Sequence, residues 1–213
     1  MKLGFVGLGN MGAPMATRLL AWPDGLVVCD VRADATVPFA AAGAAVADSP
    51  EAVAAVARII SVTVLDDAQV RQVVDGMLRS AVPGTVIAVH STISDETAVE
   101  LGTLCSARGV EFLDAPVSGG KPAAARGELA VLIGGSPDAF AAVREPFALF
   151  GGLVVRAGGV GAGTRMKLAR NLLHFVSFAA AAEAQRLAEQ AGIDLPTLGK
   201  VVRHTDAITG GAG

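Results

Sequence analysis

The stretch KLGFVGLGNMG, residues 2–12, places a short apolar run directly before three glycines with the spacing G-x-G-x-x-G. A helix-like pattern, MGAPMATRLL, follows at once. In such a strand–turn–helix unit, Gly7 permits the tight turn, Gly9 lets a pyrophosphate approach the backbone, and Gly12 lets the helix pack closely on the strand. Free amides and the partial positive charge at the helix start attract the phosphates.

This loop is therefore the expected dinucleotide site, and the alternative is a glycine-rich turn with no ligand. The expected cofactor-binding residues in it are Gly7, Leu8, Gly9, Asn10, Met11 and Gly12.

A second apolar run, LVVCD at residues 26–30, ends in a carboxylate near the distance from the glycines expected for a ribose-binding acid. Asp30 would accept hydrogen bonds from the adenosine ribose and repel a 2′-phosphate, so it favours NAD over NADP. Arg32 would instead attract that phosphate, unless it is an ordinary solvated loop residue.

Short apolar runs without period-2 alternation recur along the first part of the chain and alternate with helix-like segments, as in buried parallel sheets. The expected strands cover residues 2–7, 26–30, 59–65, 85–90, 110–117, 129–135 and 152–158. The expected fold class is α/β: a Rossmann-type doubly wound, mostly parallel sheet over residues 1–162.

After residue 162 the pattern changes to one long helix over residues 163–192, apolar on nearly all sides between residues 172 and 182. A further helix begins at Pro196. A helix that is apolar all round must be covered by other helices or by another subunit. Residues 163–213 are therefore expected to begin a second, helical domain, and the protein is expected to form a homo-oligomer through it.

Composition narrows the partners. Apolar residues make up 52% of the chain, and the formal net charge is −3. This charge argues against a nucleic-acid or anionic-membrane partner, and the longest apolar stretch is too short to span a bilayer. Cys29 and Cys105 fit neither a disulfide framework nor a metal-ligand spacing. We expect a cytoplasmic protein with a small-molecule partner and no metal.

A second candidate site lies in DAPVSGGKPAAARG, residues 114–127, where Pro122 suits the first turn of a helix. The backbone amides of Ser118, Gly119 and Gly120 would be uncommitted at that helix start and could bind a substrate carboxylate. The alternative is an ordinary helix start with Ser118 as its cap. Asp114 ends its strand too early to be the preferred base.

A third candidate site lies in GAGTRMKLARN, residues 161–171, where glycines precede a helix that carries Lys167 and Asn171 on one face. A partly desolvated lysine amine can take up and release a proton, and an asparagine amide can orient a substrate oxygen. The alternative is a lysine that extends to water. The chain has no tyrosine, which excludes a Tyr–Lys pair. His90 is expected to be structural.

Three stretches together, GFVGLGNMGAPMATRLL, FLDAPVSGGKPAAARGELAVLIGG and GAGTRMKLARN, resemble the signatures of the β-hydroxyacid dehydrogenase family. The resemblance implies a Rossmann domain that binds NAD(P), followed by an all-helical substrate domain. It implies that Lys167 is the catalytic acid/base and that Ser118, Gly119, Gly120 and Asn171 hold the substrate. It also implies that Val64, Leu65, Ser91 and Thr92 lie in the loops that contact the cofactor.

Two departures from the family pattern stand out. Arg170 occupies a position where many family members have a second asparagine, and the chain ends at TGGAG, where the family's helical domain continues. The helical domain is therefore expected to be incomplete in this chain.

The resulting expectation is an NAD-dependent oxidoreductase that converts a small 3-hydroxy acid, 3-hydroxyisobutyrate or similar, to the semialdehyde. A non-catalytic dinucleotide-binding sensor or association module is the alternative from another class. Within the fold, a phosphosugar dehydrogenase or an imine reductase is the alternative.

Overall fold

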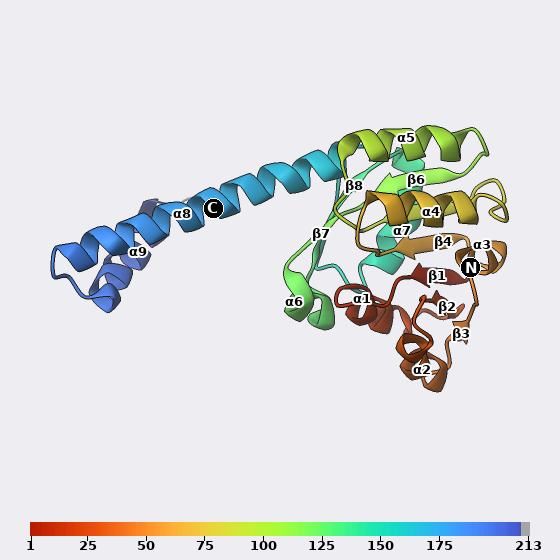
Figure 1. Cartoon of the computed structure of the whole chain (residues 1–213), viewed down its shortest axis with the longest axis horizontal. Helices are drawn as coiled ribbons and strands as arrows, with labels where there is room; N and C mark the ends of the chain where they lie inside the picture. The colour runs from red at the N-terminus through yellow and green to blue at the C-terminus, as the bar shows by residue number, and fades with distance from the viewer. Residues whose placement is uncertain (210–213) are drawn as a thin grey trace. The chain divides into compact units, whose positions relative to one another are not determined.

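The computed structural model describes residues 1–209, which divide into two compact units, one from Met1 to Lys167 and one that begins at Leu168. The first unit is a twisted sheet with helices on both faces (Figure 1). Among the described residues, the sheet contains nine strands. The strands are β1 Leu3–Val6, β2 Leu26–Cys29, β3 Ala45–Val46, β4 Ile59–Val62, β5 Val86–Val89, β6 Glu111–Asp114, β7 Val117–Ser118, β8 Ala130–Gly134 and β9 Leu153–Gly158.

Six strands form a parallel sheet in the order β3-β2-β1-β4-β5-β6. This is the strand order of doubly wound nucleotide-binding domains, in which the order of the strands reverses between β1 and β4. β8 pairs antiparallel with β6 and β7, and β9 pairs parallel with β8. The expected α/β fold with a mostly parallel sheet is therefore confirmed, with an antiparallel extension at one edge.

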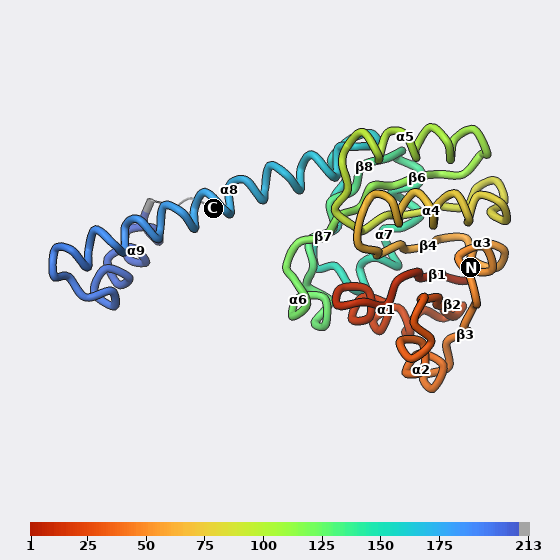
Figure 2. The backbone as a smooth tube through the Cα atoms, viewed as in Figure 1, coloured from red at the N-terminus to blue at the C-terminus, as the bar shows by residue number. Residues whose placement is uncertain are grey.

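The helices are α1 Gly12–Leu19, α2 Ala33–Ala41, α3 Pro50–Val56, α4 Asp67–Met77, α5 Asp95–Ser106, α6 Gly120–Arg126, α7 Pro137–Phe147, α8 Ala162–Gln190 and α9 Leu195–Thr209. Helices α1 to α7 connect the strands of the first unit and cover its sheet, and α8 and α9 follow the last strand. The backbone trace in Figure 2 shows α6 beside α1, which lies about a hundred residues earlier in the chain. The glycine-rich loop and the segment at residues 117–120 thus belong to neighbouring parts of one unit.

Two apolar clusters, one on each face of the sheet, form the core. Phe5 of β1 packs in one cluster with residues of α1 and α7, and its neighbour Val6 packs in the other with residues of α3, α4 and α5. Successive strand residues point to opposite faces, so a strand covered on both sides has no polar positions to alternate. This explains the continuous apolar runs in the sequence.

The sequence did not predict β3, and it predicted one strand over residues 110–117 where the structure has β6 and the separate strand β7; β3 and β7 are each two residues long. Ala45 and Val46 are exposed at the sheet edge, and a pair of residues is too short to show a periodic pattern.

The second unit contains the greater part of α8, together with α9. The large apolar side chains of α8 beyond Leu168 are mostly exposed, among them Leu172, Leu173, Phe175, Val176 and Phe178. No helix within residues 1–209 is long and apolar enough to cross a membrane.

Candidate active site

The loop between β1 and α1 has the geometry that a bound dinucleotide requires. Gly7 has φ +92°, and a Cβ at this position would collide with the backbone oxygen of Thr63. A Cβ on Gly12 would collide with the backbone oxygen of Gly7, so the helix packs directly on the turn. A Cβ on Gly9, in contrast, would meet nothing within 4 Å. The loop is therefore tight on its inner side and open at Gly9, which fits a pyrophosphate against the backbone.

Asp30 follows β2 and connects the loop after β2 with the glycine-rich loop after β1. Its Oδ2 accepts a hydrogen bond from the Leu8 amide at 2.6 Å, and its Oδ1 accepts one from the Arg32 amide at 2.8 Å. The Arg32 guanidinium is exposed, with Nε 3.7 Å from Oδ1. Each carboxylate oxygen keeps a second lone pair for a ribose hydroxyl. Asp30 thus fixes the glycine-rich loop as well as presenting a negative charge there.

Ser91 and Val64 connect the loops after β5 and β4. The Ser91 hydroxyl donates to the Val64 carbonyl at 2.7 Å and accepts from the Val64 amide at 2.9 Å. The neighbouring residues Leu65 and Thr92 are exposed at the same edge. The side chain of Ser91 holds the Val64–Leu65 loop, and its expected role in cofactor binding stays a prediction.

The segment expected to hold a substrate carboxylate differs in detail from the expectation. Ser118 lies in β7 opposite Ala130, and α6 begins only at Gly120. The expectation that Ser118 lies at the helix start is therefore wrong, because the segment first pairs with the sheet. Gly119 and Gly120 have φ of +127° and +71°, which only glycine adopts easily, and both are exposed.

Lys167 lies in the second turn of α8 and is half-buried. Its Nζ donates to the carbonyl of Val117 at 2.8 Å. Val117 immediately precedes Ser118, so the structure brings the lysine amine to the segment expected to bind the substrate. The sequence suggested both groups but contained no sign of this contact.

Asn171 lies one turn further along α8, in the second unit. Its Oδ1 is 3.5 Å from Nη1 of Arg170. Its expected role in orienting a substrate oxygen stays a prediction.

His90, at the end of β5, is fully buried. Its Nδ1 lies 2.8 Å from the Ala115 carbonyl, which can only accept, so Nδ1 carries the proton. Nε2 then accepts from the Ser61 hydroxyl at 3.0 Å. Burial lowers the pKa of His90 to about 4. The expectation of a structural histidine is confirmed, since a neutral ring with both nitrogens engaged is part of the core.

Asp114, at the end of β6, has a role that the sequence did not reveal. Its side chain is buried and accepts hydrogen bonds from the amides of Gly161 and Thr164, 47 and 50 residues later. A buried aspartate at a strand end was the available signal, but no pattern in the sequence identifies backbone amides as its partners.

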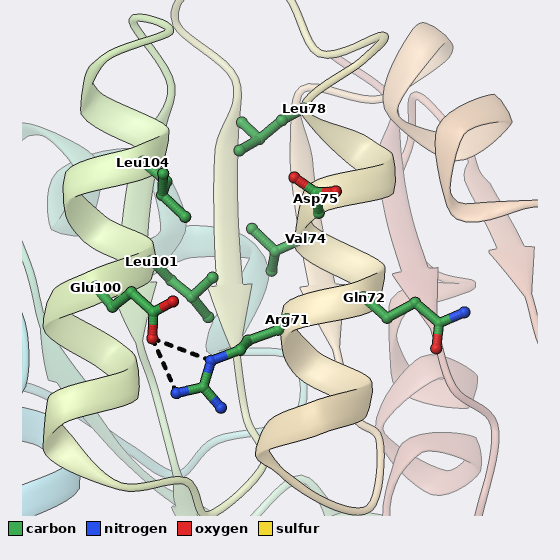
Figure 3. Close-up of a pocket in the computed structure, with 8 residues that line it drawn as sticks. All are labelled: Arg71, Gln72, Val74, Asp75, Leu78, Glu100, Leu101 and Leu104. Atoms are coloured by element: carbon green, nitrogen blue, oxygen red, sulfur yellow. Dashed lines mark hydrogen bonds and ion pairs between the residues drawn. The ribbon is translucent and has the colours of Figure 1, made fainter.

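A groove between α4 and α5 lies apart from these residues (Figure 3). Arg71 donates to Oε2 of Glu100 from Nε at 3.0 Å and from Nη2 at 2.8 Å. The apolar part of its lining consists of Val74, Leu78, Leu101 and Leu104. No signature residue lies in this groove, and residues 1–209 contain no cluster of three or more His, Cys, Asp or Glu suited to a metal ion.

Comparisons with known proteins show which family this chain resembles. Residues 2–159 match the family model described as the NAD binding domain of 6-phosphogluconate dehydrogenase. An uncharacterized oxidoreductase of Mycobacterium tuberculosis is 58% identical over the whole chain, which covers 72% of that protein. The mitochondrial 3-hydroxyisobutyrate dehydrogenase of Mus musculus is 38% identical over 94% of the chain, which covers 61% of that enzyme.

Among solved structures, the Mycobacterium tuberculosis 3-hydroxyisobutyrate dehydrogenase, described with L-serine, has a TM-score of 0.90 and 35% sequence identity. The match covers 94% of this chain and 69% of that one. With the strand order, the open glycine loop and the lysine beside the Ser-Gly-Gly segment, these matches place the chain in the β-hydroxyacid dehydrogenase family of NAD-binding oxidoreductases.

Proposed function

We propose that this protein oxidises a small 3-hydroxy acid with NAD to the corresponding semialdehyde, with Lys167 as the proton carrier. The observation that carries this proposal is the contact of the Lys167 amine with the Val117 carbonyl at 2.8 Å, directly beside Ser118. It holds a group able to exchange a proton next to backbone suited to a carboxylate.

The names of two relatives support the substrate class. One is a 3-hydroxyisobutyrate dehydrogenase, and a solved structure of another enzyme of that name is described with L-serine. Both molecules are short acids with a hydroxyl on the third carbon. A site for either acid must bind the carboxylate and, at the same time, the hydroxyl on the third carbon.

The glycine-rich loop at residues 7–12 and Asp30 would hold the cofactor, by the open backbone at Gly9 and by the Asp30 carboxylate. When bound, NAD would supply the acceptor for the hydride of the hydroxyl-bearing carbon.

The remaining work falls to residues of this chain. Gly119 and Gly120, exposed and free of side chains, let the substrate carboxylate approach the backbone. The neutral amine of Lys167 removes the hydroxyl proton as the carbonyl forms, and the resulting ammonium returns it in the reverse direction. Val117 O accepts a hydrogen bond from the amine in either state, so the nitrogen keeps its position while its charge changes. Asn171 orients the substrate oxygen.

The test is single-turnover hydride transfer from 3-hydroxyisobutyrate and from L-serine in the whole protein. Lys167→Met keeps an unbranched apolar side chain and removes the proton carrier. Turnover should fall by roughly 10²–10⁴-fold, the usual effect of losing an acid–base group. NADH affinity should stay unchanged, because the cofactor contacts lie at residues 7–12 and Asp30.

Lys121→Met is the matched control, because Lys121 is an exposed lysine that follows the Ser-Gly-Gly segment. It should transfer hydride at the parent rate. A Lys167→Met variant as fast as the parent would place the chemistry elsewhere. A parent that binds NADH but oxidises neither acid would favour the sensor function instead.

A further inference from the structure

Asp114 is a buried carboxylate that the proposed reaction does not use. Its side chain is 0% exposed. Oδ1 accepts a hydrogen bond from the Gly161 amide and Oδ2 one from the Thr164 amide, both at 2.7 Å. These amides lie at the start of α8, where backbone N–H groups have no partner within the helix. Asp114 therefore caps α8 from a distant strand, with both of its oxygens engaged.

The surrounding backbone is shaped around this contact. A Cβ on Gly134 of β8 would collide with Oδ1 of Asp114. A Cβ on Gly163 would collide with the carbonyl of Leu132 and the carbonyl of Asp114. Two glycines thus let the first turn of α8 pack directly against the ends of β6 and β8. A close approach of this kind leaves little freedom for the helix start to shift.

Burial of this carboxylate opposes its charge. Desolvation raises the pKa of Asp114, while the Thr164 and Gly161 amides act in the opposite direction. A neutral serine or asparagine next to the helix would satisfy the same amides without burying a charge. What the distant aspartate adds is a fixed link between the end of β6 and the start of α8.

The same two segments are joined a second time by Lys167. Thr164 is one turn before Lys167 in α8, and Val117, which accepts from Lys167 Nζ, is three residues after Asp114. The capping contact and the lysine contact therefore connect residues 114–117 with residues 161–167 at two points. A shift at the first point moves the second.

We propose that Asp114 is a positioning residue that sets the place of the Lys167 amine relative to the Ser118–Gly120 segment. This inference rests on the proposed function of Lys167 and adds a residue to it. Asp114 touches neither substrate nor cofactor in this scheme. It acts through the helix start, where a displacement of about 1 Å can cost roughly 10²-fold in rate.

The test compares Asp114→Asn with Asp95→Asn in the whole protein. Asn keeps the size of the side chain but turns one acceptor into a donor that faces an amide. Asp95 of α5 accepts a hydrogen bond from Nε of Arg165 at 2.8 Å in an exposed ion pair. Arg165 lies beside Thr164 in the first turn of α8. Asp95 is the matched control for a change at the helix start that leaves the buried cap intact.

Two measurements are made on each variant. Amide hydrogen exchange at Gly161 and Thr164 should accelerate at least about tenfold in Asp114→Asn and stay unchanged in Asp95→Asn. Single-turnover hydride transfer should fall roughly 10- to 100-fold in Asp114→Asn, with NADH affinity unchanged. Asp114→Glu keeps the charge, but its side chain is one methylene group longer, so this variant should not recover the rate.

A purely structural role would lower the thermal midpoint of Asp114→Asn without changing the rate per folded molecule, and that result would overturn the proposal. Unchanged exchange at Gly161 and Thr164 would overturn it whatever the rate. Failure of the proposed function has a different signature, because Lys167→Met would then transfer hydride at the parent rate while the exchange result stood.

Discussion

The hydroxyl of Ser91 forms hydrogen bonds with both backbone polar groups of Val64. It donates to the Val64 carbonyl at 2.7 Å and accepts from the Val64 amide at 2.9 Å. One side chain after β5 thereby fixes the conformation of the loop after β4. In doubly wound sheets these loops lie at the edge where cofactors bind. Loss of the contact between Ser91 and Val64 should therefore lower the affinity for the cofactor.

Ser91→Ala should weaken NADH binding, because the Val64–Leu65 loop loses its support. Both bonds to Val64 are lost, and we expect the dissociation constant to rise roughly tenfold, about 1.4 kcal/mol, the size of one or two net hydrogen bonds. Fluorescence titration of NADH measures it. Ser106→Ala, at an exposed serine at the end of α5, is the control. Unchanged NADH affinity in Ser91→Ala would show that the loop does not contribute to the site.

Asp30 should make the protein prefer NADH over NADPH, because its carboxylate repels a 2′-phosphate. Titration of the parent with both dinucleotides gives the preference directly. Asp30→Ser should weaken NADH binding and reduce the difference between the affinities for NADH and NADPH. Arg32→Ser should leave the NADH affinity unchanged. Tighter binding of NADPH by the parent would assign control of specificity to Arg32, whose guanidinium is exposed beside the site.

His90 should make stability depend on pH. Its pKa is about 4 in the folded state and near 6.5 when exposed, so between these values the unfolded chain binds a proton that the folded chain does not. Stability from the neutral ring is present above the unfolded pKa and is lost as the pH falls through this window. The loss amounts to about 3 kcal/mol by the time the folded pKa is reached.

Urea unfolding at neutral pH and near the folded pKa of His90 measures this loss. His90→Gln should be less stable at neutral pH but should lack this part of the pH dependence. His204→Gln is the control, since His204 is exposed. Equal pH dependence in the parent and in His90→Gln would assign the acid sensitivity to other groups.

The apolar surface of α8 should cause self-association. Leu172 and Phe175 are 67% and 63% exposed, and burying each side chain would contribute roughly 1.5–3 kcal/mol. Sedimentation equilibrium should therefore give a mass above that of one chain. Leu172→Glu combined with Phe175→Glu should weaken the association, and Gln185→Glu, at an exposed polar position of the same helix, should not. A well-behaved monomeric parent would contradict this expectation.

The sequence by itself determined the longer strands and helices and the nucleotide loop, because both depend on local rules. Gly7 and Gly12 are needed wherever a strand turns tightly into a helix, and their spacing is visible in the chain. Continuous apolar runs predicted strands covered on both faces, since the inward and outward positions are then equally buried. Asp30 could be found because a fixed distance in sequence separates it from the glycines.

Only the tertiary structure decided how the remaining polar groups are used. Ser91 bonds to a residue 27 positions away and Lys167 to one 50 positions away, and in both contacts the partner is a backbone group. Every residue type except proline offers the same backbone amide and carbonyl, so such partners leave no mark in the sequence. For the same reason, the sequence indicated only that Asp114 ends a strand. Its role depends on the packing of β6, β8 and the first turn of α8, which brings two distant amides to one buried carboxylate.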